Sequence, residues 1–154
     1  MATKLESYRE KIENSKYSYH ELLTLASIVE LEASTYEDRL NVAGVFYNRL
    51  NNGWTLGSDV TTYYGARKTF QDNIGPYLNS CNDYNTRGTC LKGLPVGPIC
   101  NPSIISIKSA IEPSENDYFY FVADVYKKVY FSKTDGEQQR VISDLINKGI
   151  WLET

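Results

Sequence analysis

Two glutamates, Glu30 and Glu32, interrupt an otherwise apolar segment of helical character over residues 25–34. Positions three and four apart share a face of a helix, so Glu32 lies beside Ile28 and Val29 on the apolar face, and Glu30 points almost the opposite way. Burial disfavours the charged form of a carboxyl group and raises its pKa. An acid still protonated near neutral pH can protonate a leaving group. The sequence therefore offers Glu32 as a candidate general acid, with a structural ion pair as the commoner role of such a residue.

The composition is typical of a folded protein with one domain. The 154 residues are 42% hydrophobic and 23% charged, enough for a sizeable core. A net charge of −3 without a basic cluster argues against nucleic acid as a partner. The 13 tyrosines suit a surface that faces carbohydrate, although half-buried sheet positions explain many of them equally well. We find no apolar run long enough to cross a bilayer and no signal peptide at the start.

The remaining pattern predicts helices along most of the chain and a hairpin near its end. The expected elements are an exposed helix over 4–18, a core helix over 19–33, a second helix capped by Ser34 or Thr35 (a Ser34–Glu37 capping box) and ended by 51–53, a short helix over 60–64, a helix from Asn101 to before Pro113, strands over 118–123 and 129–131, and a helix from Thr134 to about Lys148. Residues 54–101 lack long periodic segments, which is typical of a functional loop region. This order predicts an α+β domain over 19–154, with helices packed on a small antiparallel hairpin, and a helical extension over 1–18.

Several kinds of chemistry have no support in the sequence. Phosphate-binding and dinucleotide-binding glycine motifs are missing, so we expect no nucleotide cofactor. The single histidine, His20, stands among polar residues, which indicates a surface position and not a catalytic triad. Cys81, Cys90 and Cys100 are too widely spaced for a zinc site, and no metal is expected. A Cys81–Cys90 disulfide is possible, but the sequence does not fix the pairing. Carboxylate chemistry remains, and a buried glutamic acid serves glycosidic cleavage most directly.

Motifs in an unbroken order carry a resemblance to a known family. They are Ala-Ser-Ile-Val-Glu-Leu-Glu-Ala at 26–33, Val-Ala-Gly-Val-Phe-Tyr-Asn-Arg-Leu at 42–50, Leu-Gly-Ser-Asp-Val-Thr-Thr-Tyr-Tyr-Gly at 56–65, Tyr-Asn-Thr at 84–86, Gly-Leu-Pro-Val-Gly-Pro-Ile-Cys-Asn-Pro at 93–102 and Tyr-Phe-Val-Ala-Asp at 120–124. Together they resemble the YceG-like family of endolytic murein transglycosylases. The resemblance covers roughly residues 23–141.

The resemblance implies an enzyme that cuts within nascent peptidoglycan strands between N-acetylmuramic acid and N-acetylglucosamine. The muramyl C6 hydroxyl attacks its own anomeric carbon, which leaves a 1,6-anhydro end without hydrolysis. By register, Glu32 is the catalytic residue, first as acid and then as base, and Glu30 is a supporting or structural carboxylate. The full-length parent is expected to be anchored in the membrane and to act on its extracytoplasmic face. Its implied partners are peptidoglycan glycan strands and, as a further candidate, cell-wall synthesis enzymes.

The resemblance also gives a role to polar residues of the loop region. We expect Ser58, Asp59, Tyr84, Asn85 and Thr86 along a glycan groove, where they orient sugars or hold Glu32. A helix cap is the equally weighted interpretation of the first two.

The sequence departs from the family pattern at several points. Val60 and Val96 stand in place of usual prolines, and histidines that relatives carry in the hairpin and at the last helix cap are missing. Any role of those histidines cannot be carried over. The usual transmembrane helix and small preceding domain are not in this sequence either, so the chain resembles the catalytic domain alone.

Two alternative functions remain open. A muramidase would need a second carboxylate, for which Asp59 or Glu30 is available, and would release reducing ends where a transglycosylase leaves anhydro ends. A silent peptidoglycan-binding module would bind strands and release no product.

Overall fold

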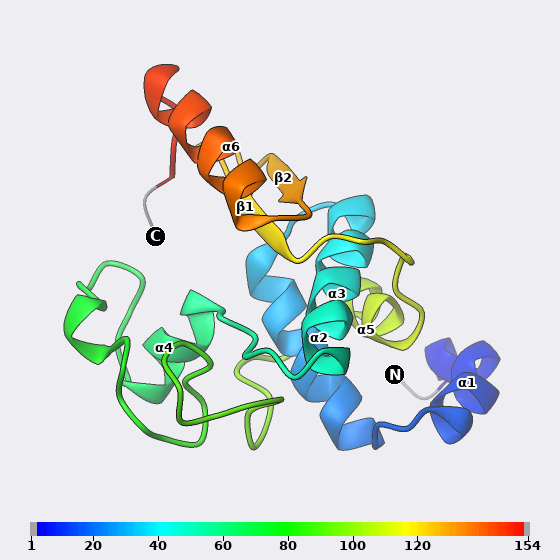
Figure 1. Cartoon of the computed structure of the whole chain (residues 1–154). Coiled ribbons are helices and arrows are strands. Elements are labelled where there is room, and N and C mark those ends of the chain that lie inside the picture. Colours follow the sequence, from blue (N-terminus) through cyan, green and yellow to red (C-terminus); the bar gives the residue numbers. More distant parts are fainter. Residues whose placement is uncertain (1–2, 153–154) are drawn as a thin grey trace.

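The core is formed by three helices that pack against one another: α2 (Tyr19–Glu32), α3 (Tyr36–Asn51) and α5 (Ile104–Ile111). They lie near the centre of Figure 1, which draws a computed structural model; the structure describes residues 3–152. Nearly every residue of α2 from position 22 to position 29 is buried, on all sides of the helix. The fold is α+β, as predicted.

The caps explain where these helices begin. Ser18 forms a capping box with Glu21 at the start of α2, a signal that the sequence analysis did not use. Thr35 caps α3, and its hydroxyl accepts from the Asp38 amide, so the capping box predicted at Ser34 is wrong. Ser103 caps α5 in the same manner, two residues beyond the predicted cap at Asn101.

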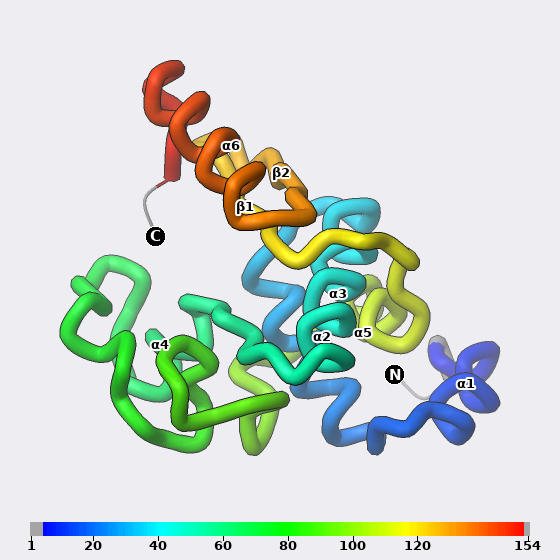
Figure 2. Tube along the Cα trace, viewed as in Figure 1, coloured from blue at the N-terminus to red at the C-terminus, as the bar shows by residue number. Residues whose placement is uncertain are grey.

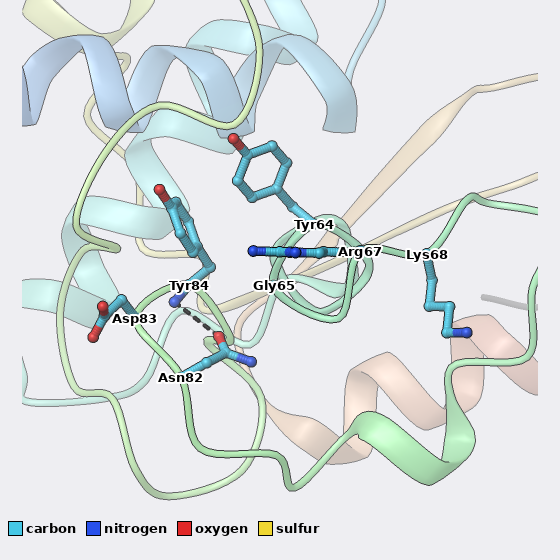
Figure 3. A pocket seen from close by; sticks show the side chains of 7 residues that line it. All are labelled: Tyr64, Gly65, Arg67, Lys68, Asn82, Asp83 and Tyr84. Atoms are coloured by element: carbon cyan, nitrogen blue, oxygen red, sulfur yellow. Dashed lines mark hydrogen bonds between the residues drawn. The ribbon is translucent and has the colours of Figure 1, made fainter.

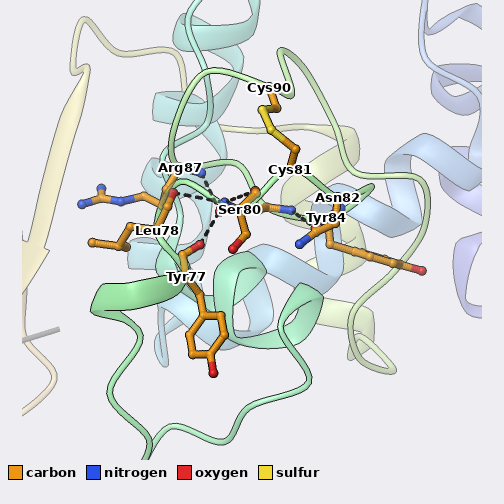
Figure 4. The surroundings of a disulfide bond; sticks show 9 residues. Tyr77, Leu78, Ser80, Cys81, Asn82, Tyr84, Arg87 and Cys90 are labelled. Carbon is orange, nitrogen blue, oxygen red and sulfur yellow. Dashed lines mark hydrogen bonds between the residues drawn. A yellow bond between two sulfur atoms is a disulfide. The ribbon is translucent and has the colours of Figure 1, made fainter.

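A loop-rich region follows α3 and lies apart from the helical core in Figures 1 and 2. Its regular elements are α4 (Asp59–Gly65) and the 3₁₀ helix η2 (Gly75–Tyr77). A disulfide joins Cys81 to Cys90 (Figure 4), which confirms the possible pairing. Cys100 is a free thiol. The helix predicted over 60–64 is present as α4, which begins one residue earlier than predicted and ends one residue later.

The C-terminal part is a hairpin covered by a helix. Strands β1 (Tyr120–Ala123) and β2 (Val129–Ser132) pair antiparallel, and α6 (Asp135–Asn147) packs on both. Thr134 caps α6 with the predicted residue, and Gly149 follows its end at a φ of 71°. This part joins the core through an edge-to-face contact between Phe46 and Phe121.

The N-terminal segment is helical over the 3₁₀ helix η1 (Thr3–Tyr8) and over α1 (Arg9–Asn14), so the helix predicted over 4–18 is shorter than expected and ends at residue 14. It is not wholly exposed, because Leu5 is buried in the same cluster as the α2 side chains. The division into an extension over 1–18 and a domain over 19–154 stays a prediction. Within residues 3–152, none of the helices has the length and apolar character that crossing a membrane requires.

Candidate active site

Glu32 is the last residue of α2 and is half-buried where the loop-rich region meets the helical core. The Ser58 hydroxyl donates to its Oε1 across 3.2 Å. Ser58 occupies the N-cap position of α4, yet its side chain makes no cap hydrogen bond there. Of the two interpretations of this serine, the cap holds by position only, because the buried hydroxyl is used to hold Glu32.

The surroundings of Glu32 favour its neutral form. Burial, the largest effect, raises its pKa to about 7. The hydrogen bond from Ser58 and the positive charge of Arg87 oppose this rise, while the negative charge of Asp59 adds to it. Glu32 is therefore divided between acid and carboxylate near neutral pH, as the sequence predicted for a buried general acid.

Asp59 and Arg87 form an ion pair beside Glu32, with 3.1 Å between Oδ1 and Nε. The carboxylate is mostly buried, and the guanidinium is partly exposed. Arg87 also donates to the carbonyl of Gly57 across 3.0 Å, which ties it to the chain that leads into α4. Sequence reasoning missed Arg87, although it directly follows the Tyr-Asn-Thr motif at 84–86.

The approach of residues 56–58 to the core depends on a glycine. Gly57 has a φ of 64°, and a Cβ there would lie 2.7 Å from the Arg49 guanidinium. Arg49 donates to the Leu56 carbonyl across 2.9 Å, and the Gly57 amide donates to Thr86 across 2.9 Å. These bonds tie the segment that leads to Ser58 to α3 and to the 84–86 loop.

Asn85 and Thr86 lie beneath the surface, so of the two roles expected for them, orienting sugars or holding Glu32 in place, their burial favours the second. Asn85 is 2% exposed and Thr86 is fully buried. The side-chain Nδ2 of Asn85 donates to three backbone carbonyls of the 77–80 segment, and its Oδ1 accepts from the Thr62 hydroxyl. Thr86 accepts from the Ser58 amide across 2.9 Å. Their side chains form hydrogen bonds that hold the loops together, because backbone groups in this region have few partners in regular secondary structure.

Tyr84 is half-buried and faces an open pocket of about 550 Å³ (Figure 3). A second open pocket, of about 460 Å³, lies nearer to the ion pair, because Arg87 and Gly57 form part of its wall. The residues that line it are Arg49, Trp54, Thr55, Gly57, Leu78, Asn79, Arg87, Gly88 and Tyr120. Trp54 is 40% exposed and packs against Phe119 and Tyr120, so this pocket offers an aromatic wall that the sequence analysis did not identify.

Glu30 has different partners from Glu32. Arg39 pairs with its Oε2 at 2.8 Å, and its Oε1 accepts from the Ser103 amide at 2.7 Å and from the Ser106 hydroxyl at 3.1 Å. Burial would raise its pKa, but the bonds from Ser103 and the charge of Arg39, with a smaller part from Ser106, lower it overall. Glu30 is thus an ionised carboxylate that joins α2, α3 and the start of α5.

The family model that matches the chain is that of the YceG-like family, over residues 1–144. The chain belongs to the YceG-like family. This membership agrees with the motifs around the Glu32 site, since the match includes α2, α4 and the loops that hold them.

Relatives and a solved structure support the assignment. A Bacillus subtilis (strain 168) protein named endolytic murein transglycosylase is 38% identical over 136 residues, which cover 88% of this chain and 37% of that protein. A Streptococcus pneumoniae protein of the same name is 35% identical over 153 residues, which cover 96% of this chain and 27% of that protein. A YceG-like protein from Listeria monocytogenes matches with a TM-score of 0.81 and 35% identity, covering 90% of this chain and 45% of that one. This YceG-like chain thus spans about a quarter to two fifths of the length of these two transglycosylases.

No group of three or more His, Cys, Asp or Glu side chains within residues 3–152 could hold a metal ion. His20 lies at the surface, as expected, and its Nε2 is 2.8 Å from the Val96 carbonyl oxygen. The charged and ionisable groups at this YceG-like site are the Glu32 carboxyl and the Asp59–Arg87 pair.

Replacing Glu30 tests its structural role. We expect Glu30→Gln to lower the free energy of unfolding by about 2 kcal/mol, because it leaves Arg39 and the α5 amide without an ionised partner. Chemical denaturation at pH 7 measures this. Glu112→Gln, which breaks only the exposed pair with Lys11, is the matched control and should cost less than about 0.5 kcal/mol. Equal costs for the two variants would contradict the structural role.

The raised pKa of Glu32 predicts a pH-dependent effect of Glu32→Gln on stability. The folded pKa of about 7 exceeds the ordinary value of 4.5, so the folded state of the wild type holds the proton longer and loses stability as pH rises between these values. The glutamine variant does not suffer this loss. We expect it to gain about 1–3 kcal/mol relative to wild type on going from pH 4 to pH 8. Denaturant unfolding of both proteins at the two pH values tests this, and a gain independent of pH would refute it.

Proposed function

We propose that this chain is the catalytic domain of a lytic transglycosylase that cleaves within peptidoglycan strands, with Glu32 as its single acid and base. The observation that carries the proposal is the Glu32 carboxyl itself, which has a pKa near 7 and lies beside the Asp59–Arg87 pair. The names of the similar Bacillus and Streptococcus proteins supply the substrate class. Because the chain spans only part of those proteins, the activity of the whole protein is part of the proposal.

The proposed reaction uses both protonation states of Glu32 in turn. The protonated carboxyl gives its proton to the oxygen between N-acetylmuramic acid and N-acetylglucosamine, and the bond from that oxygen to the anomeric carbon breaks. The muramyl C6 hydroxyl then bonds to the anomeric carbon and returns a proton to the Glu32 carboxylate. A pKa close to the working pH suits a group that must donate and accept. The negative charge of Asp59 favours the positive charge that develops on the sugar ring.

The alternative hydrolytic mechanism finds less support in the geometry. A muramidase needs a second carboxylate that reaches the sugar or a water molecule. Asp59 is 16% exposed and paired with Arg87, while Glu30 is held by Arg39 and the start of α5. Neither carboxylate is free to act as a nucleophile. A silent binding module would have no need of a buried glutamic acid with a pKa near 7, since burial of that group costs stability.

The location and the partners of the parent protein are part of the same proposal. A protein that acts on peptidoglycan acts outside the cytoplasm, and we propose that the parent protein is anchored to the extracytoplasmic face of the membrane. Cell-wall synthesis enzymes are the proposed partners there.

Product analysis tests the acid and base role. We expect wild-type protein incubated with peptidoglycan glycan strands to release 1,6-anhydromuramyl ends, detected by mass spectrometry. Glu32→Gln should reduce their formation by about a hundredfold or more, since the amide cannot transfer the proton. Folded Glu30→Gln, two residues away, is the matched control and should remain active. Reducing ends from the wild type would show hydrolysis and refute the transglycosylase proposal.

The ion pair predicts opposite shifts of the pH profile. Asp59→Asn removes a charge that raises the pKa of Glu32, so the decline of kcat/KM at high pH should move to lower pH. Arg87→Gln removes a charge that lowers this pKa, so the same decline should move to higher pH. We expect shifts on the order of half a pH unit in each direction. Shifts of one sign for both variants would mean that the pair does not set the pKa of Glu32.

A further inference from the structure

The pocket at the C-terminal end of α4 has no part in the chemistry at Glu32. The residues that line it are Tyr64, Gly65, Arg67, Lys68, Asn82, Asp83 and Tyr84. None of them contacts Glu32, whose partners Ser58 and Asp59 lie at the other end of α4. A helix of this length spans about 10 Å, so a ligand in both places must be extended.

Two tyrosines form the aromatic wall of this pocket. The rings of Tyr64 and Tyr84 meet edge to face with centroids 4.7 Å apart, and Tyr64 is 44% exposed. Asn82 holds this wall in place, because its Oδ1 accepts from the Tyr84 amide at 2.9 Å (Figure 3). The same oxygen accepts from the Asn85 amide at 2.8 Å. Gly65 allows α4 to approach Asn82, since a Cβ there would lie 2.5 Å from that same oxygen. The two rings are thus fixed and partly exposed, which suits stacking against the apolar face of a sugar.

Arg67 adds an uncompensated positive charge to the aromatic wall. In Figure 3 its side chain extends from the end of α4 toward the two rings. Among residues 3–152 the guanidinium has no ion-pair or hydrogen-bond partner. Its backbone has a φ of 57°, a region that glycine occupies at less cost. An arginine kept in this conformation with a free guanidinium is suited to a carboxylate of the ligand.

The other charged residues of the pocket are directed elsewhere. The Lys68 ammonium lies over the Tyr77 ring, 5.3 Å from its centroid. The Asp83 carboxylate points away from the two tyrosines in Figure 3, and its backbone carbonyl accepts from the Val96 amide. Arg67 is therefore the charge that a ligand on the tyrosine wall would meet first.

We infer that this pocket is a second subsite of the glycan strand, in which a sugar ring packs on Tyr64 and Tyr84 while a carboxylate of the strand binds Arg67. The inference rests on the proposed function for the identity of the polymer. In peptidoglycan the carboxylate has two sources, the free lactyl group of a muramyl residue without its peptide and the carboxylates of a stem peptide. Both present the same chemistry to the guanidinium.

Binding to the whole chain tests the subsite without turnover if every protein carries Glu32→Gln. The probes are peptide-free glycan strands with free lactyl carboxylates, peptide-bearing strands, and neutral N-acetylglucosamine oligomers. We expect Arg67→Gly to raise Kd about tenfold for whichever carboxylate source binds and less than twofold for the neutral oligomers. Glycine relieves the backbone at this position, so this variant should fold at least as well as its parent. Tyr64→Ala should weaken all three probes.

Lys68→Met is the matched control, because it removes one neighbouring positive charge that points away from the tyrosine wall. It should change each Kd less than twofold, and an effect equal to that of Arg67→Gly would refute the subsite in favour of general electrostatic attraction. Unchanged binding in Arg67→Gly would also refute it. Anhydro products from wild-type protein, together with unchanged binding in this variant, would overturn the subsite alone. Weakened binding with no anhydro products from wild type would instead overturn the proposed function.

Discussion

The site depends on the desolvation of one carboxyl group at the end of a buried helix. Glu32 closes α2 where ionisation is costly, and the negative end of the helix dipole acts in the same direction as burial. Ser58 and Arg87 offset enough of this cost to leave the pKa near 7. Each of these residues belongs to a segment remote in sequence from α2, so the loop-rich region must fold correctly before the acid has its properties.

The other glutamate of α2 shows the reverse balance of the same forces. Glu30 accepts from an amide at the start of α5, where the helix dipole is positive, and pairs with Arg39. Two carboxyl groups two residues apart thus have pKa values shifted in opposite directions, so at neutral pH Glu30 is ionised while Glu32 is only partly ionised. One stabilises the packing of three helices, and the other keeps its proton to a higher pH and costs stability when it ionises. Such divergent environments are the pattern by which acid and base roles are recognised in proteins.

Local signals in the sequence were enough for most of the fold. The helical stripe of α3, the Thr134 cap of α6 and the hairpin strands follow from short-range periodicity and capping chemistry, and all are present. Thr35, one of the two caps predicted for α3, is confirmed and Ser34 is not, while Ser103 caps α5 in place of Asn101, because residues of suitable type lie close together at both helix starts. Helical geometry placed Glu32 on an apolar face and Glu30 on the opposite one. Because α2 is buried on both faces, the two glutamates differ by their partners and not by the face on which they lie.

The polar residues of the loop region show why the site itself was harder to predict. Asn85 and Thr86 look like surface residues by type, yet they are buried, because their side chains bond the carbonyls of residues 77–80, the Thr62 hydroxyl and the Ser58 amide. Arg87 could not be assigned a partner from spacing, because its contact with Asp59 joins segments 28 positions apart. Burial and pairing between distant segments are tertiary properties, which periodicity does not carry.

The exposure of Arg87 connects binding to acidity. Arg87 lies on the wall of the pocket that also contains Trp54, and its charge is one of the two influences that lower the pKa of Glu32. A neutral sugar in that pocket would displace water around Glu32 and disfavour its carboxylate further. A ligand carboxylate that drew Arg87 away from Asp59 would act in the same direction, because it would uncover a negative charge beside Glu32. If the proposed function holds, either effect would increase the protonated fraction of Glu32 when a strand is bound, so the acid would be most available when there is a glycosidic oxygen to protonate.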